Sequence, residues 1–272
     1  MPCYGSFGLS NAPRAGCAIR RFVSRWLAQS ATLLTALTLA VSPSMAASTR
    51  VAVAANFTEA AQEIAAAFTA ATGDTAELSF GSTGTLYTQI SQGAPYEVFL
   101  AADAARPAKA VAEGLAVAGS RFTYAIGRLV LYSSEPSRVT GETTLTKGAF
   151  DRLAIANPAT APYGAAAVAT LQALGIYEAV RPKLVQGTSI AQAYQFVATG
   201  NAELGLVALA QVAGKPGGSH WQVPAELHDP IDQDAVLLEA GRDSAAAGAF
   251  LNFLKSPEAG AIIRRYGYET GA

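Results

Sequence analysis

Short apolar runs alternate with segments of helical periodicity along almost the whole chain. The runs at 48–55, 76–80 and 96–103 are typical of buried strands, and the patterns over 57–73 and 85–93 are typical of helices that end at a glycine. Strand–helix–strand units at this spacing pack as right-handed parallel crossovers, with helices on both faces of a sheet. The sequence therefore predicts the α/β class.

The run 121–134 is long for one strand, and only Gly127 interrupts it. A strand that leaves one sheet and enters another would give this pattern. A second strand–helix series follows. It predicts strands at 151–158, 182–186, 202–209 and 235–241 and helices at 164–175, 189–200, 244–256 and 256–268. Segment 212–233 is rich in Gly and Pro, so we expect a loop and a return crossing there.

The simplest architecture has two α/β lobes joined by two crossings, one near Gly127 and one near Gln233. Lobe I would hold residues 48–127 and 233–272, and lobe II residues 128–232. A single larger sheet is the alternative. Two lobes would leave a cleft outside the carboxyl ends of the parallel strands, which is where small ligands bind in such folds.

Residues 1–47 have the composition of a secretory signal peptide. They hold four arginines and no acid, and an apolar run of about 16 residues leads into the small-residue stretch SMAAS. The pair Arg20-Arg21 only faintly resembles a twin-arginine signal, so the export route stays open. The run is short for a membrane span, which needs about 20 residues. We expect a protein exported to the periplasm.

Loss of this segment would change the charge and the cysteine content. Four of the 19 Lys and Arg residues lie in it, so 15 remain against 20 Asp and Glu, a net charge of about −5. No basic block is left to neutralise phosphates, which argues against a nucleic-acid partner. Cys3 and Cys17 both lie in it, so disulfides and thiolate chemistry are excluded from the exported part.

Four strand-to-helix turns carry similar chemistry. They place Asn56 after VAVAA, Gly81-Ser82-Thr83-Gly84 after ELSF, ATAPYG after LAIANP, and Gly187-Thr188-Ser189 after KLVQ. Helix starts offer unpaired N–H groups and a positive dipole end, so several aimed at one point would bind an anion without a cationic side chain. Each residue alone could equally be an ordinary helix cap, and Glu59 fits a capping role for Asn56.

Other chemistries fit these turns poorly. A phosphate-binding P-loop needs Lys after its glycines, but Thr85 and Leu86 follow Gly84. A nucleophile elbow needs glycine two residues before Ser82, where Phe80 stands. His220 and His228 lie in the irregular segment, and we expect exposed loop residues there. Asp229, Asp232 and Asp234 lack calcium-loop spacing, so we expect a solvated connection and no metal site.

With these turns aligned, the chain closely resembles the periplasmic molybdate-binding proteins of ABC importers, the ModA family. The resemblance covers nearly all of residues 49–268. It rests on VAVAANFTEAAQEIAAAF, SFGSTGTLYTQISQGAPYEVFLAAD, ANPATAPYGAAA, QGTSIAQAYQFVATGNAELGLVALAQV and FLNFLKSPEAGAIIRRYGY. It implies the two-lobe periplasmic binding protein fold, in which each lobe is a mainly parallel sheet flanked by helices. It also implies binding of molybdate or tungstate without catalysis or a cofactor, and delivery by a monomer to a membrane permease.

The resemblance also implies the anion contacts. They fall on Ala55 and Asn56 in the first turn, Ser82 and Thr83 in the second, Tyr163 in the third, and Ser189 with the Ile190 N–H in the fourth. Some members add a tyrosine hydroxyl where this chain has Ala208, so the contact set departs from theirs at that point.

The chemistry of the four turns bears on the ligand. Molybdate at neutral pH is a dianion with only acceptor oxygens, so a site made of donors suits it. No acid lies at the turns to accept the proton of phosphate. Sulfate is also a dianion, and only cavity size could reject it, so a sulfate-binding protein is the alternative. A third hypothesis, an exported esterase or phosphatase using Ser82 or Thr83, lacks a base beside those hydroxyls.

Overall fold

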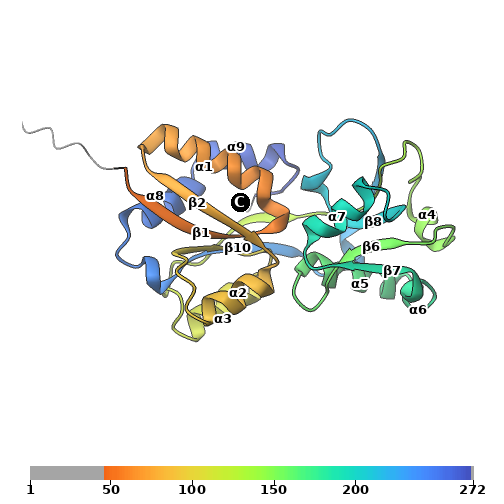
Figure 1. Cartoon of the computed structure of the whole chain (residues 1–272), viewed down its shortest axis with the longest axis horizontal. Coiled ribbons are helices and arrows are strands. Elements are labelled where there is room, and N and C mark those ends of the chain that lie inside the picture. Colours follow the sequence, from red (N-terminus) through yellow and green to blue (C-terminus); the bar gives the residue numbers. More distant parts are fainter. Residues whose placement is uncertain (1–45, 271–272) are drawn as a thin grey trace, which may run out of the picture. The chain divides into compact units, whose positions relative to one another are not determined.

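The computed structural model describes residues 46–270, which form two lobes, each built on a five-stranded sheet flanked by helices (Figure 1). The α/β class and the two lobes are thereby confirmed. The predicted signal peptide, residues 1–47, lies almost entirely outside the described residues. Within 46–270, no helix combines the length and the apolar character needed to cross a membrane.

The first sheet has the strand order β2-β1-β3-β10-β4. Its strands are β1 Ser48–Ala54, β2 Thr75–Gly81, β3 Val98–Leu100, β4 Phe122–Gly127 and β10 Ile231–Leu237. β1 pairs in parallel with β2 and β3, whereas β10 is antiparallel to both of its neighbours. A register shift interrupts the β10–β4 pairing between Gln233 and Asp234, and such a bulge re-aims the side chains beside it.

The second sheet has the order β7-β6-β8-β5-β9. Its strands are β5 Leu129–Ser133, β6 Leu153–Ala156, β7 Leu184–Gly187, β8 Leu204–Ala208 and β9 Ser219–Gln222. β6 pairs in parallel with β7 and β8, and β5 is antiparallel to β8 and β9. Each sheet is therefore parallel in the part that carries the predicted turns.

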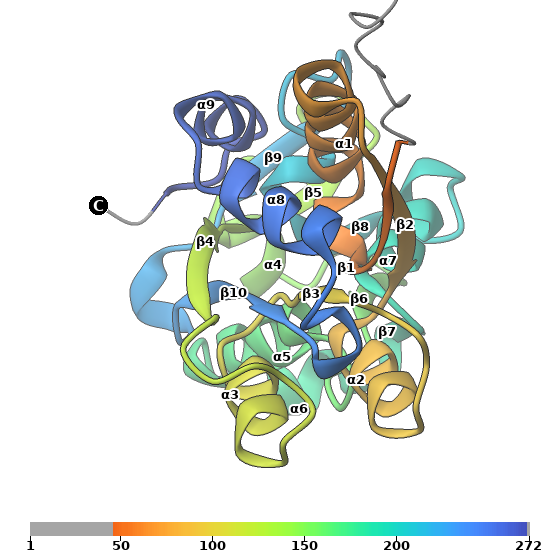
Figure 2. The ribbon, with the colours of Figure 1, turned by 90° about the vertical axis from the view of Figure 1, so that its left-hand side faces the viewer.

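Helices pack on both faces of each sheet (Figures 1 and 2). The α-helices are α1 Thr58–Thr72, α2 Thr83–Ser91, α3 Ala105–Ala112, α4 Glu142–Thr146, α5 Pro162–Ala173, α6 Tyr177–Val180, α7 Ile190–Ala198, α8 Ala245–Leu254 and α9 Pro257–Arg265. Short 3-10 turns are η1 Ala55–Phe57, η2 Arg181–Lys183, η3 Leu209–Gln211, η4 Ala225–Leu227 and η5 Glu239–Gly241.

The alternation of side chains along β1 explains how these layers form. Val51 and Val53 lie in the hydrophobic cluster that contains Phe68 of α1 and Phe250 of α8. Ala52, between them, lies in a separate cluster with Leu86 of α2. Successive residues of a strand point to opposite faces, so the apolar run of β1 is buried on both sides.

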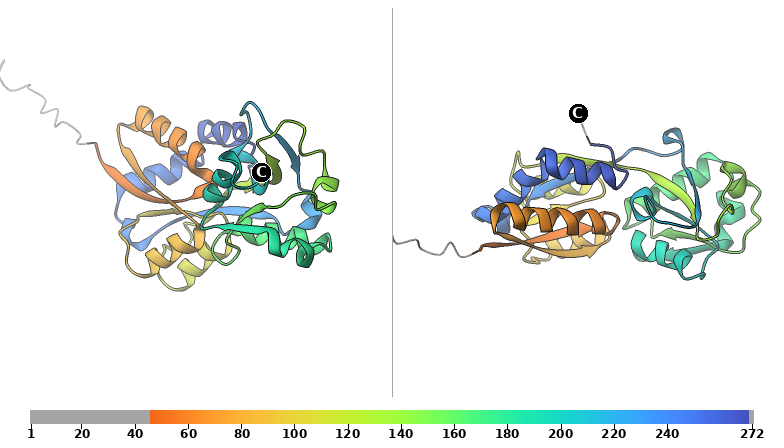
Figure 3. Two further views of the ribbon diagram at one scale, coloured as in Figure 1. Left: turned by 45° about the vertical axis from the view of Figure 1, so that its right-hand side comes forward. Right: turned by 90° about the horizontal axis from the view of Figure 1, so that it is seen from above.

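Within residues 46–270 the chain crosses from one lobe to the other twice (Figure 3). β4 ends at Gly127 in the first sheet and β5 begins at Leu129 in the second. The return follows β9, and the chain is back in the first sheet with β10. The exact lobe bounds, 48–127 with 233–272 and 128–232, stay a prediction.

Several local predictions are wrong. The segment 212–233 is not all loop, because it contains β9 and the start of β10. Asp234 is not in a solvated connection. Only 2% of it is exposed, and its carboxylate accepts hydrogen bonds from Arg121 Nη1 and Thr123 Oγ1, both at 2.7 Å. His220 is exposed as predicted, but it lies in β9 rather than in a loop.

A stability prediction follows from the aromatic packing of the first lobe. Phe68 is fully buried and meets the rings of Phe250 and Phe253 edge-on, at centroid distances of 5.4 and 5.8 Å. We expect Phe68→Ala to lower the free energy of unfolding by about 3–5 kcal/mol, through lost burial and the cavity left behind. Urea denaturation would measure it. Phe80 is 39% exposed, so Phe80→Ala should cost far less, and equal costs would contradict the packing described.

Candidate functional site

A small cavity lies where the two lobes meet, and six of the seven predicted site residues line it. They are Ala55, Asn56, Ser82, Thr83, Tyr163 and Ile190, and the remaining lining residues are Ala54, Ala102, Ala161 and Pro162. Its volume is about 10 Å³, against roughly 300–1,000 Å³ for pockets that take drug-sized molecules. The cavity is therefore too small for a drug-sized molecule and has room for about one water-sized group. None of its lining residues carries a charge.

The order of the strands explains why these turns converge. From β1 the chain moves to β2 on one side and then to β3 on the other. In the second sheet β6 is followed in the same way by β7 and β8 on opposite sides. Ligands bind in such sheets at the point where the order reverses, beyond the carboxyl ends of the strands. The two reversal points face each other across this cavity.

Two hydroxyl groups reach the cavity from the start of α2. Ser82 is the N-cap, and its Oγ lies 2.7 Å from Thr85 Oγ1 and accepts from the Thr85 N–H at 3.4 Å. Thr83 Oγ1 accepts from the Ala102 N–H at 3.0 Å and is buried. The protein uses one lone pair of the Thr83 hydroxyl, and its proton remains available to donate.

Asn56, a predicted anion contact, is not the helix cap that was the alternative for this residue. It lies inside η1, and neither η1 nor α1 has a side-chain cap. Its Nδ2 donates to Gln233 Oε1 at 2.8 Å and to Tyr268 Oη at 3.0 Å, which uses both amide protons. Glu59 does not cap either, since its carboxylate accepts from Lys215 Nζ at 2.6 Å. Asn56 can therefore offer an anion its backbone N–H.

Gln233 is the centre of a buried polar network behind the cavity. Its Oε1 accepts from Asn56 and from the Tyr124 hydroxyl, the latter at 3.2 Å. Its Nε2 donates to Tyr163 Oη at 3.3 Å. The Tyr268 hydroxyl closes the network by donating to the Asn56 carbonyl at 2.8 Å. This role is not apparent from the sequence, in which Gln233 ends the segment 212–233 predicted as a loop and return crossing; its closeness to the strand-like run that begins at Ala235 is the one signal.

Tyr163 enters the cavity wall from α5 and is 1% exposed. Because Tyr163 Oη accepts from Gln233 Nε2, its proton is free for another acceptor. Burial raises the pKa of the Tyr163 hydroxyl, so the proton stays in place at neutral pH. A methyl group built on Gly127 would lie 2.1 Å from this hydroxyl, so glycine at the crossing leaves it room.

The fourth turn contributes Ile190 rather than Ser189 to the cavity lining. Ser189 is the N-cap of α7, and its Oγ accepts from the Gln192 N–H at 3.4 Å. Gln211 Nε2 donates to the Ile190 carbonyl at 3.2 Å and its Oε1 accepts from the Ala208 N–H at 3.1 Å. Ala208 does not line the cavity. The sequence analysis did not single out Gln211.

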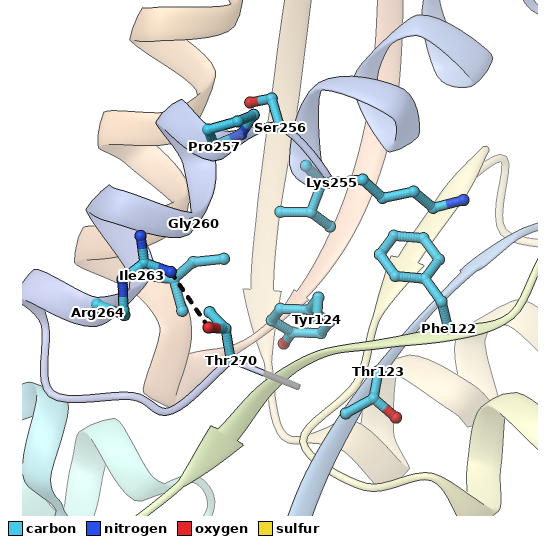
Figure 4. A pocket seen from close by; sticks show the side chains of 11 residues that line it. Phe122, Thr123, Tyr124, Lys255, Ser256, Pro257, Gly260, Ile263, Arg264 and Thr270 are labelled. Carbon is cyan, nitrogen blue, oxygen red and sulfur yellow. Dashed lines mark hydrogen bonds between the residues drawn. The ribbon is translucent and has the colours of Figure 1, made fainter. Parts of the chain in front are cut away.

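A larger cavity of about 310 Å³ lies in the first lobe, beneath the start of α9 (Figure 4). None of the four turns lines it. Lys255 Nζ lies over the Phe122 ring, 4.3 Å from its centroid, and Arg264 Nη1 donates to Thr270 Oγ1 at 3.2 Å. Its cations are therefore engaged with their neighbours, and we do not assign it a ligand.

The residues that line the small cavity present hydroxyl and backbone donors, and none of them carries a charge or pairs a nucleophile with a base. Neither His220 nor His228 lines it. Among residues 46–270, no group of three His, Cys, Asp or Glu side chains is placed to hold a metal ion. The arrangement can hold a small anion by hydrogen bonds alone.

Comparison with known proteins gives the class of protein that this fold and site define. Residues 49–269 match the family described as bacterial extracellular solute-binding protein. A solved structure, the periplasmic molybdate-binding protein of Azotobacter vinelandii, superposes with a TM-score of 0.80 at 40% sequence identity, over 82% of this chain and all of that one.

Two curated relatives narrow the class further. The molybdate-binding protein ModA of Rhodobacter capsulatus is 59% identical over 84% of this chain and 90% of its own length. The ModA protein of Azotobacter vinelandii is 57% identical over 82% of this chain and 90% of its own. The chain belongs to the ModA family of solute-binding proteins.

The buried tyrosines predict how stability depends on pH. Burial raises the pKa of Tyr124, Tyr163 and Tyr268 above the ordinary value of about 10. The folded state then keeps protons that the unfolded chain releases, so this stabilisation is complete below pH 10 and is lost as the pH rises further. Each tyrosine adds up to about 1.4 kcal/mol per pH unit to the fall in the free energy of unfolding.

Urea denaturation from pH 8 to pH 11.5 would measure this fall. We expect Tyr163→Phe to reduce the slope of the free energy of unfolding against pH by up to about 1.4 kcal/mol per pH unit above pH 10, because one fewer tyrosine titrates there. Below pH 9.5 the slope should not change. An unchanged decline would contradict the shift assigned to Tyr163.

Proposed function

We propose that this protein binds molybdate or tungstate in the cavity between its lobes and delivers the anion to an ABC importer. One observation carries the proposal. Six predicted contact residues from four separate turns line one small cavity, and none of its lining residues carries a charge. Membership of the ModA family supports the choice of anion.

The contacts that we assign divide into hydroxyl and backbone donors. Ser82, Thr83 and Tyr163 would each donate a hydroxyl proton. Ala55, Asn56 and Ile190 would contribute backbone N–H groups at helix starts, where such groups lack partners within the helix. Ser189 would act by capping α7 behind the Ile190 N–H.

The energy of such a site is adequate without a cation. A hydrogen bond to a charged group contributes about 1.5–3 kcal/mol, and a helix dipole adds about 0.3–1 kcal/mol. Five or six donors give on the order of 10 kcal/mol before the costs of desolvation and lobe closure. Micromolar affinity corresponds to about 8 kcal/mol, so a Kd of that order is within reach.

The same chemistry gives discrimination against phosphate. Phosphate near neutral pH carries a proton that needs an acceptor, and no carboxylate lines the cavity. Burying that proton without a partner would cost about 1–3 kcal/mol. Molybdate and tungstate carry no such proton. Sulfate does not either, so size must separate it from them.

The remaining assignments accompany this function. Residues 1–47 would direct export to the periplasm, where the protein would act as a monomer that docks on a permease. Residues 48–127 with 233–272 would close against residues 128–232 around the anion. Binding and release would be the whole activity, with no catalytic step and no cofactor.

Isothermal titration of the purified protein with molybdate, tungstate, sulfate and phosphate in one buffer would test the function. We expect binding of the first two at micromolar Kd or tighter, and no detectable heat from phosphate. Sulfate binding with an equal Kd would support an anion site but contradict its assignment to molybdate and tungstate. The absence of binding heat with all four anions would overturn the proposal.

The hydroxyl of Tyr163 offers a sharper test. Tyr163→Phe should weaken molybdate binding by about 10- to 150-fold, which corresponds to one hydrogen bond to a charged group. Tyr177→Phe, on α6 and away from the cavity, is the matched control and should bind as the unsubstituted protein does. Equal affinities for the two variants would remove Tyr163 from the contact set.

A further inference from the structure

One backbone hydrogen bond joins the lobes directly beside the cavity. The N–H of Gly84, in the first turn of α2, donates to the Thr160 carbonyl at 2.8 Å. Thr160 belongs to the loop between β6 and α5, one residue before the cavity-lining Ala161. The Gly84 N–H is one of the free donors at a helix start, and here the opposite lobe takes it instead of a ligand.

No space remains between the two backbones at this point. A methyl group built on Gly84 would lie 3.0 Å from both the Cα and the carbonyl oxygen of Thr160, and 3.1 Å from Arg106 Nη2. Arg106 reaches the same loop, because its Nη2 donates to the Ala159 carbonyl at 3.1 Å. The contact is therefore between backbones, and further approach of the lobes here is blocked by atoms that cannot rotate away.

The loop that carries Thr160 is held firmly. The N–H groups of Thr160 and Ala161 both donate to the Asn157 carbonyl, at 3.2 and 2.9 Å, and the Ala159 N–H donates to Asn157 Oδ1 at 3.0 Å. The Asn157 N–H donates to the Gly187 carbonyl at 2.8 Å, which ties the loop to the end of β7. Pro158 and Pro162 fix their own backbone angles within this loop.

We propose that Gly84 and Thr160 form a rigid stop that ends lobe closure and thereby fixes the size of the anion cavity. The inference rests on the proposed function and identifies the contact that gives the anion site its size selectivity. The walls on the second lobe, Ala161 to Tyr163, continue directly from the stop, so their distance from Ser82 and Thr83 is set by contact between protein backbones. A smaller anion such as sulfate could not draw the walls closer to recover its contacts.

Substitution of Gly84 would move the stop outward. Gly84 lies in α2 with a backbone conformation that other residues adopt, since its φ is not positive. Gly84→Ala and Gly84→Val would insert a side chain against Thr160 and hold the lobes progressively further apart. Gly248, in α8, is also a helical glycine without a positive φ, and no atom lies within 4 Å of a methyl group built on it. Gly248→Ala and Gly248→Val are therefore matched controls.

The test is titration of the unsubstituted protein and these four variants with molybdate, tungstate and sulfate, with melting temperatures measured without ligand. We expect the Kd for molybdate and tungstate to rise at least tenfold in Gly84→Ala and further in Gly84→Val. The Gly248 variants should stay within twofold. A crystal structure of Gly84→Ala with molybdate should show a separation between the position-84 nitrogen and Thr160 O longer than in the unsubstituted complex.

The possible results of this titration distinguish failure of the rigid stop from failure of the proposed function. No oxyanion binding by the unsubstituted protein would overturn both. Molybdate binding that both Gly84 variants retain within twofold would overturn the stop alone. So would tighter sulfate binding in a Gly84 variant, because a wider cavity cannot improve contacts with a smaller anion. An equal loss of affinity in the Gly84 and Gly248 variants would also overturn it, since the effect would then come from glycine replacement in any helix.

Discussion

The constraint on which the rest of the structure depends is that the four strand-to-helix turns end at one point. In each sheet the strand order reverses beside the cavity, so helices start there from both lobes. Their free N–H groups supply partial positive charge without any side-chain cation. The chain therefore needs no lysine or arginine in the cavity to accommodate a dianion, and it avoids the desolvation of a buried ion pair.

The direction of each hydrogen bond is fixed by the protein. The Thr83 hydroxyl accepts from a backbone N–H, and the Tyr163 hydroxyl accepts from Gln233. Each is left with a proton to give. Gln233 sits beside the bulge of β10 and also accepts from Asn56 and Tyr124. Such a network rigidifies its members when each one is satisfied.

Local periodicity predicts the strands and helices, and the rule that ligands bind beyond the carboxyl ends of parallel strands predicts that the turns lie together. The sequence could not predict how buried polar side chains pair across the fold. Taken alone, Asn56 is typical of a helix cap, because asparagine before a helix usually is one, but its amide partners lie about 180 to 210 residues further along the chain. Asp234 was predicted to be solvated, but its partners are Thr123 in β4 and Arg121, the residue that precedes β4. Strand β9 is short and follows Gly217 and Gly218, so its periodicity was hidden.

Gly84 belongs both to the turn at the start of α2 and to the contact between the two lobes. Its place in the sequence GSTG is typical of an anion-binding turn, where glycine lets a ligand approach the backbone. In the folded protein the group that approaches is the Thr160 carbonyl of the other lobe. Ser82 and Thr83 of this turn line the cavity, whereas the Gly84 N–H donates to the protein. A binding site made only of donors also needs something to set its width, because donors alone do not reject a smaller anion of the same charge.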